Sequence, residues 1–270
     1  MSRISHISEQ ASEQGRKLLI PYLVAGDPDV SSSLALMHEL VRQGADIIEL
    51  GVPFSDPASD GPVIQRGVER ALAGGTSLAD TLELVSQFRQ QDGETAIVLM
   101  GYLNPIEIMG YSQFVEAAAN AGVDGVLVVD MPPSESTELH QGLQQAGLDT
   151  IYLVAPTTSA ARAEAITRVC SGYLYYVSLK GVTGAALTDH ESVANSINDL
   201  RQLTDLPIVI GFGIKDAASA AAMGRLSDGI IIGSALVERI AEWSEISAEE
   251  RDVADTCSVI GAARAAIDAL

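Results

Sequence analysis

Acidic residues in one short stretch of the sequence could perform acid–base chemistry. Glu49 lies between an isoleucine and a leucine in the apolar run 46–50. Burial among apolar side chains raises the pKa of a carboxyl group, which can then both donate and accept a proton near neutral pH. Asp56 and Asp60 follow in the proline-rich loop 52–62, from which Asp60 could reach toward Glu49. The alternatives are a structural carboxylate paired with an arginine or with backbone amides for Glu49, and helix capping for Asp60.

Small residues that follow three later apolar runs indicate a second site, for phosphate. They are Gly213, the pair Gly233 and Ser234, and the segment 181–184. Glycines let the backbone approach an oxyanion closely, and a serine hydroxyl at a helix start adds a donor. A tight turn explains any one of these segments alone. All three at consecutive strand ends favour a phosphorylated ligand.

Other catalytic chemistries have weaker support in the sequence. No histidine lies at the end of an expected strand, which disfavours a metal site and a serine triad; the four are His6, His38, His140 and His190. Lys180 follows the apolar run 173–177 and could form an imine with a carbonyl substrate. It lies in a loop, however, rather than in the apolar interior that would lower its pKa.

The elements that must position these residues alternate along the whole chain. Eight apolar runs, nearly continuous in Val, Ile, Leu and Tyr, predict strands buried on both faces of a parallel sheet. They are residues 18–24, 46–50, 96–100, 125–129, 150–154, 173–177, 207–210 and 229–232. Helical spacing separates the runs, and no linker divides them. We therefore expect one α/β domain over residues 1–270, a TIM (β/α)8 barrel with extra terminal helices, rather than an open doubly wound sheet.

Composition excludes several classes of partner. The chain has 36 acidic and 16 basic residues, and its formal net charge of −20 repels nucleic acid and anionic lipid. Cys170 and Cys257 are far apart, which suits a reducing compartment. No apolar run approaches the ~20 residues of a membrane span, and the first residues lack the apolar core of a signal peptide. We expect a cytoplasmic protein with no nucleic-acid or membrane partner.

Together these motifs resemble the α subunit of tryptophan synthase. The match runs in order from about Leu18 to Val237. It consists of PYLVAGDP at 21–28, GADIIELGVPFSDP at 44–57, DGPVIQ at 60–65, GYLNP at 101–105, DMPP at 130–133, YYVS at 175–178, GVTG at 181–184 and GFGI at 211–214. The long motif around Glu49 is highly specific, whereas the phosphate-loop pattern occurs in several other barrels.

The resemblance implies retro-aldol cleavage of indole-3-glycerol phosphate to indole and glyceraldehyde 3-phosphate. Glu49 would move protons, Asp60 would accept the indole N–H, and Tyr175 would support the two carboxylates. Residues expected to bind the phosphate are Thr183, Gly184, Gly213, Gly233 and Ser234; those expected to line the indole slot are Tyr22, Leu99, Met100 and Phe212. Position 22 is Tyr where many family members carry Phe, a change expected to alter packing against indole rather than the chemistry.

The resemblance also implies a partner, a β subunit that holds pyridoxal phosphate in an α2β2 heterotetramer. No cofactor and no metal are expected in this chain. The predicted contact loops are 53–56 and 130–133, with Pro53, Phe54, Asp56 and Pro132. Segment 179–189 is predicted to be a lid that is mobile without ligand. Two alternatives remain: another phosphate-binding aldolase that uses Lys180 as a Schiff base, and a chain that acts mainly as an allosteric partner of the β subunit.

Overall fold

The strands form one parallel sheet that closes on itself. The structure, a computed structural model, describes residues 2–178, 190–211, 213–247 and 252–270. Within them the strand order is β5-β4-β3-β2-β1-β9-β8-β7-β6. The strands are β1 (Leu18–Val24), β2 (Ile47–Gly51), β3 (Ala96–Gly101), β4 (Gly125–Val128), β5 (Asp149–Thr150), β6 (Tyr152–Val154), β7 (Leu174–Val177), β8 (Ile208–Gly211) and β9 (Gly229–Ile232).

The fifth predicted strand is divided in two. β5 pairs with β4, and β6 pairs with β7. Only Ile151 separates β5 from β6, and its N–H donates to the carbonyl of Val126. The two short strands thus join the ends of the sheet, and the predicted TIM barrel is confirmed.

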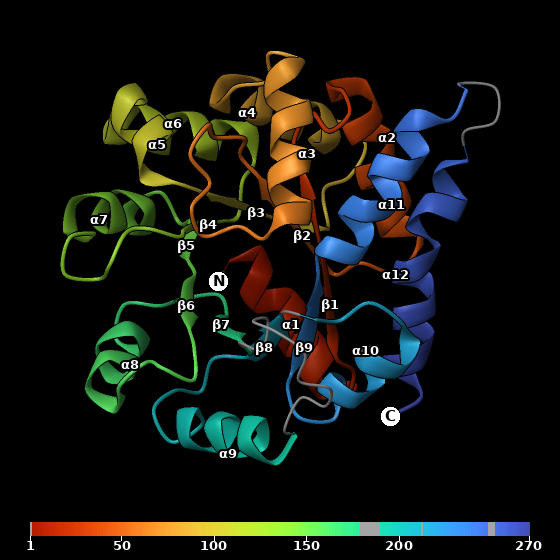
Figure 1. The fold of residues 1–270 in the computed structure, drawn as a ribbon. Coiled ribbons are helices and arrows are strands. Elements are labelled where there is room, and N and C mark those ends of the chain that lie inside the picture. Colours follow the sequence, from red (N-terminus) through yellow and green to blue (C-terminus); the bar gives the residue numbers. More distant parts are fainter. Residues whose placement is uncertain (1, 179–189, 212, 248–251) are drawn as a thin grey trace.

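Helices surround the barrel (Figure 1). They are α1 (Arg3–Glu13), α2 (Val30–Arg42), α3 (Pro62–Ala73), α4 (Leu78–Arg89), α5 (Leu103–Met109), α6 (Tyr111–Ala121), α7 (Thr137–Gln145), α8 (Ala160–Thr167), α9 (His190–Leu200), α10 (Ala217–Gly224), α11 (Ser234–Glu245) and α12 (Val253–Asp268). Several begin at a side chain that accepts from the first turn, such as Ser77 before α4 and Asp216 before α10. The extra terminal helices are α1 and α12, and α12 packs on α2, α10 and α11.

The core has two layers because successive side chains of a strand point to opposite faces. In β1, Ile20 and Tyr22 belong to the layer inside the barrel, whereas Leu19 and Leu23 belong to the layer between strands and helices. Both layers are apolar, which explains why the strands read as continuous hydrophobic runs. In β2, Ile47 lies in the inner layer, so Glu49, two residues later, also faces the barrel interior.

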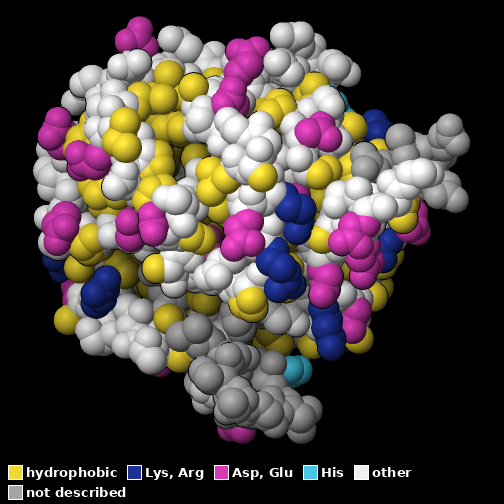
Figure 2. Space-filling view, turned by 45° about the horizontal axis from the view of Figure 1, so that its top comes forward, with side chains coloured by type: hydrophobic (Ala, Val, Ile, Leu, Met, Phe, Trp, Pro, Cys, Tyr) yellow, Lys and Arg dark blue, Asp and Glu magenta, His cyan; other side chains and the backbone are white. Residues whose placement is uncertain are grey.

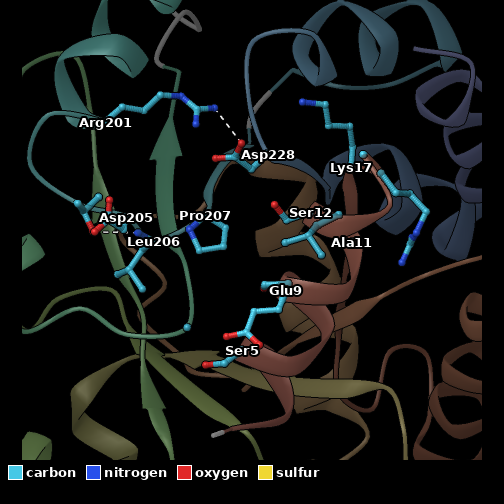
Figure 3. Close-up of a pocket in the computed structure, with 16 residues that line it drawn as sticks. Ser5, Glu9, Ala11, Ser12, Lys17, Arg201, Asp205, Leu206, Pro207 and Asp228 are labelled. Carbon is cyan, nitrogen blue, oxygen red and sulfur yellow. Dashed lines mark hydrogen bonds and ion pairs between the residues drawn. The ribbon is translucent and has the colours of Figure 1, made fainter.

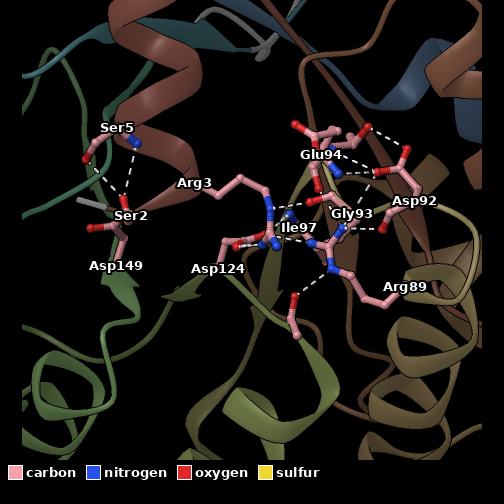
Figure 4. Close-up of polar contacts among 12 residues, drawn as sticks. Ser2, Arg3, Ser5, Arg89, Asp92, Gly93, Glu94, Ile97, Asp124 and Asp149 are labelled. Atoms are coloured by element: carbon pink, nitrogen blue, oxygen red, sulfur yellow. Dashed lines mark hydrogen bonds and ion pairs between the residues drawn. The ribbon is translucent and has the colours of Figure 1, made fainter.

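A polar network fixes α1 to the N-terminal end of the barrel (Figure 4). Asp124, which is buried, accepts from Arg89 at 2.7 Å and from the backbone N–H of Ile97 at 2.8 Å, and it also pairs with Arg3 of α1. Ile4 of α1 is fully buried in the inner layer. Helix α1 therefore covers the barrel interior at this end, and the opposite end carries the residues that the sequence predicts to be catalytic. Within the described part of the chain, no helix has the length and apolar character needed to cross a membrane.

Candidate functional site

Glu49 is buried inside the barrel, as the sequence predicted. Its Oε1 accepts a hydrogen bond of 2.5 Å from the Tyr173 hydroxyl. Its Oε2 is also buried, and no group in the described residues bonds to it. Burial raises the pKa of Glu49 to about 7, and the hydrogen bond from Tyr173 opposes this rise. The predicted rise in pKa is confirmed, and such a carboxyl can donate and accept protons near neutral pH.

Three tyrosines lie around Glu49, and the sequence identified two of them. Tyr22 is paired with Glu49 in the register of β1 and β2. Tyr175 lies close enough for the charge of Glu49 to add to the effect of burial, and both raise the pKa of its phenol. The hydrogen bond to Glu49, however, comes from Tyr173, which precedes β7. Tyr173 and Tyr175 are two residues apart and therefore share one strand face. This two-residue spacing was the signal in the sequence that could have identified Tyr173.

Glycines on neighbouring strands make room for two of these phenols. A Cβ added at Gly51 would collide with the hydroxyl oxygen of Tyr22, and one at Gly211 would collide with that of Tyr175. Gly51 and Gly211 are the last residues of β2 and β8. Both phenols therefore lie at the mouth of the barrel, one layer beyond Glu49.

Asp60 lies in the loop before α3 and is partly buried. Burial raises the pKa of its carboxyl, whereas a hydrogen bond from the Tyr102 hydroxyl lowers it. The same hydroxyl accepts from the backbone N–H of Ser59 at 3.0 Å, which fixes the loop beside the barrel mouth. The N-cap of α3 is Gly61, without a side-chain cap, so the capping alternative for Asp60 is wrong.

A buried ion pair attaches α3 to the end of β1. Arg70 of α3 donates to both carboxylate oxygens of Asp27, from Nε at 2.7 Å and from Nη2 at 2.8 Å. Asp27 is fully buried, and burial raises its pKa while Arg70 opposes the rise. Because only Gly61 separates Asp60 from α3, this pair also restrains the loop that carries Asp60.

Three of the predicted phosphate residues are described, and they lie at two adjacent strand ends. Gly213 follows β8 and has a φ of 76°, a conformation that favours glycine. Gly233 is the N-cap of α11 and gives no side-chain cap; Ser234 is the first residue of that helix and is exposed. The first N–H groups of a helix lack intrahelical partners and attract anions. Thr183, Gly184, Phe212, Lys180 and the predicted lid 179–189 lie outside the described residues.

The two residues of β3 predicted to line the indole slot lie on opposite faces of the strand. Met100 packs against the inner layer. Leu99 is 1% exposed and belongs to the layer between strands and helices. Because side chains alternate along a strand, only one of two neighbours can face the barrel interior. The structure therefore removes Leu99 from the predicted slot.

The predicted partner loops lie at the rim beside the mouth. Phe54 packs on Tyr102, with ring centroids 5.4 Å apart, and Asp56 is exposed. Pro53 is buried beneath this loop. Pro132 is partly exposed in the loop after β4.

The sequence reasoning missed Ile108 of α5. This side chain is 82% exposed, and α5 is joined to the loop after β4 by a 2.9 Å hydrogen bond from the N–H of Leu103 to Asp130. Figure 2 shows hydrophobic side chains exposed on the face that carries α5 and α6, among scattered acidic groups.

A separate cavity of about 580 Å³ opens at the other end of the barrel, beside α1 (Figure 3). None of the predicted site residues lines it. Its three basic groups are already engaged: Lys17 donates to the Ser227 carbonyl at 2.7 Å, Arg201 pairs with Asp228 at 2.8 Å, and Arg16 pairs with Asp46 at 2.7 Å. The described residues contain no cluster of three or more side chains suited to a metal ion. The candidate active site is thus the mouth that contains Glu49 and Asp60.

Comparisons with known proteins identify the family of the chain. Residues 8–267 match the family model described as tryptophan synthase alpha chain. The chain is 52% identical to the tryptophan synthase alpha chain of Methylococcus capsulatus over 270 residues, which cover all of both proteins. It is 56% identical to that of Marinobacter nauticus over 89% of each chain. The solved alpha subunit of Legionella pneumophila superposes with a TM-score of 0.92 at 42% identity over the full length of both chains. The chain therefore belongs to the tryptophan synthase alpha chain family.

Proposed function

We propose that Glu49 and Asp60 divide the proton chemistry of this lyase of tryptophan biosynthesis, which cleaves indole-3-glycerol phosphate to indole and glyceraldehyde 3-phosphate. One observation carries the assignment. Glu49 is fully buried at the barrel mouth with one oxygen held by Tyr173 and the other unbonded within the described residues, and its pKa is about 7. A carboxyl in this state can transfer a proton in both directions.

The reaction needs two proton transfers and one broken carbon–carbon bond. Protonated Glu49 gives its proton to the indole ring carbon that bears the side chain, and the ring becomes a cationic indoleninium. Asp60 accepts the ring N–H and stabilises this positive charge; its hydrogen bond from Tyr102 favours the ionised form. The Glu49 carboxylate then removes the proton of the adjacent alcohol. The carbon–carbon bond breaks, its electrons neutralise the ring, and the alcohol carbon becomes the aldehyde.

The phosphate group would bind where α11 begins. Gly233 and Ser234 present backbone N–H groups and a hydroxyl there, with Gly213 beside them at the end of the next strand. Because the chain carries a net charge of −20, this local arrangement of donors rather than a general positive field would attract the phosphate. Tyr22 and Met100 would form apolar walls of the indole slot, and Tyr175 would support the carboxylates.

A β subunit is the partner that family membership implies. We propose an α2β2 heterotetramer in which the β subunit holds the pyridoxal phosphate. Phe54, Asp56, Pro132 and the exposed Ile108 support a contact surface at the rim of the barrel mouth. A contact at this rim would place the active site of the β subunit on the same side of this chain as the barrel mouth.

We further propose that residues 1–270 form one domain that works in the cytoplasm. The first strand β1 lies beside the last strand β9, which supports a single folding unit. Cys170 and Cys257 are free thiols, which supports a reducing compartment.

The test is indole release from indole-3-glycerol phosphate by the purified chain, with and without a β subunit. We expect release that increases with the partner and is lost in Glu49→Gln, because glutamine cannot transfer the proton. Activity that survives in this variant contradicts the role of Glu49. Substrate-dependent borohydride labelling of Lys180 would favour the imine mechanism instead. Activation of the β subunit without any cleavage by the wild-type chain would favour a mainly allosteric role.

A further inference from the structure

The side chain of Tyr22 lies at the barrel mouth, between the ends of the two strands that flank β1. Its side chain is 7% exposed and belongs to the inner layer. At one end, a Cβ added at Gly233 would lie 3.5 Å from its Cδ1; at the other, a Cβ added at Gly51 would collide with its hydroxyl oxygen. The ring therefore reaches from the proposed phosphate segment to the strand end beside Glu49.

The Tyr22 hydroxyl lies in a strongly acidic environment. Burial raises the pKa of this phenol well above its usual value, and the charges of Asp60 and Glu49 raise it further. The hydroxyl therefore keeps its proton at every physiological pH. It is a hydrogen-bond donor within reach of the charges of both carboxylates of the site.

Each carboxylate already has a phenol donor of its own. Tyr173 donates to Glu49, and Tyr102 donates to Asp60. Within the described residues, the structure records no hydrogen bond that engages the Tyr22 hydroxyl. Its proton is thus available to a ligand that enters the mouth.

We propose that the Tyr22 hydroxyl donates a hydrogen bond to the substrate's side-chain alcohol, at the carbon that becomes the aldehyde. This inference rests on the proposed function. As Glu49 removes the proton of that alcohol and the carbon–carbon bond breaks, the oxygen carries developing negative charge before the carbonyl forms. A fixed donor stabilises such an oxygen without giving up its own proton. From the sequence we expected Tyr at position 22 to alter only the packing against indole. The proposal gives its hydroxyl a role in the chemistry as well.

The experiment that tests this hydrogen bond compares Tyr22→Phe with the wild-type chain. We expect kcat for indole release to fall about tenfold while KM changes little, because one hydrogen bond that forms mainly in the transition state is lost. The pH midpoints should stay in place, since Tyr22 acts on the substrate rather than on Glu49. Tyr176→Phe is the matched control: Tyr176 is a buried neighbour of the site that lies in the outer layer, and its variant should retain kcat.

A substrate analogue separates this role from packing. The probe is 3-(indol-3-yl)propyl phosphate, which keeps the ring and the phosphate but has neither side-chain hydroxyl. Its Kd, measured by calorimetry, should be equal for the wild-type chain and Tyr22→Phe.

Three results for Tyr22→Phe would overturn this inference and leave the proposed function intact. The first is an unchanged kcat, and the second is a weaker Kd for the analogue that accounts for the lost activity. The third is a shifted pH midpoint, which would mean that Tyr22 acts through a carboxylate. Absence of indole release by the wild-type chain would overturn the proposed function together with it.

Discussion

The buried carboxyl of Glu49 should make the stability of the fold depend on pH. An ordinary glutamate has a pKa of 4.5, and burial raises that of Glu49 to about 7. Below pH 4.5 the group is protonated in both the folded and the unfolded chain. As the pH rises toward 7 the unfolded chain releases its proton first, so the free energy of unfolding falls, and it levels off above pH 7.

The size of this effect follows from the shift. A difference of about 2.5 pKa units, at about 1.4 kcal/mol per unit, gives a full loss of about 3 kcal/mol. Glu49→Gln removes the ionisation while it keeps an oxygen that can accept from Tyr173. Relative to the wild-type chain, this variant should therefore gain about 2 to 3 kcal/mol between pH 5 and pH 9.

Urea unfolding at pH 5, 7 and 9, followed by circular dichroism, measures this gain. Because every other titrating group is common to both proteins, its contribution cancels in the difference. Glu116→Gln, on the exposed face of α6, is the matched control and should show no pH-dependent gain. If Glu49→Gln differs from the wild-type chain by the same amount at every pH, the carboxyl does not have a raised pKa, and the proposed two-way proton transfer loses its basis.

Three further substitutions test other contacts of the site. Tyr173→Phe removes a hydrogen bond to Glu49 worth about 1.5 to 3 kcal/mol. The pH midpoint assigned to Glu49 in kcat/KM should therefore rise by about 1 to 2 units. An unmoved midpoint would show that this bond does not lower the pKa of Glu49. Arg70→Ala leaves the buried Asp27 without its partner, and denaturant unfolding should report a loss of about 3 kcal/mol. Leu99→Ala should cost about 3 kcal/mol of stability with little change in KM, and a large rise in KM would return Leu99 to the indole slot.

Residue patterns that are local in the sequence predicted the barrel. Eight continuous apolar runs predicted the strands, of which only the fifth is divided in two, because a strand covered on both faces needs apolar side chains at every position. Glu49 was recognisable because it interrupts one of these runs with a charge. The position of Asp60, before α3, followed from its neighbouring glycine and proline.

Contacts across the barrel were decided by the tertiary structure alone. Tyr173 and Glu49 are 124 residues apart, and their hydrogen bond exists because the sheet closes. The same closure sets which side chains face inward, which excluded Leu99, and how the loop after β2 folds back, which buried Pro53.

The sequence by itself thus determined which residue types are present and which element carries each of them, since hydrophobic periodicity and turn residues act over a few positions. Register, closure and the partners of each buried polar atom depend on chain segments distant in the sequence. No local pattern encodes them, and they emerge only when the strands pack together.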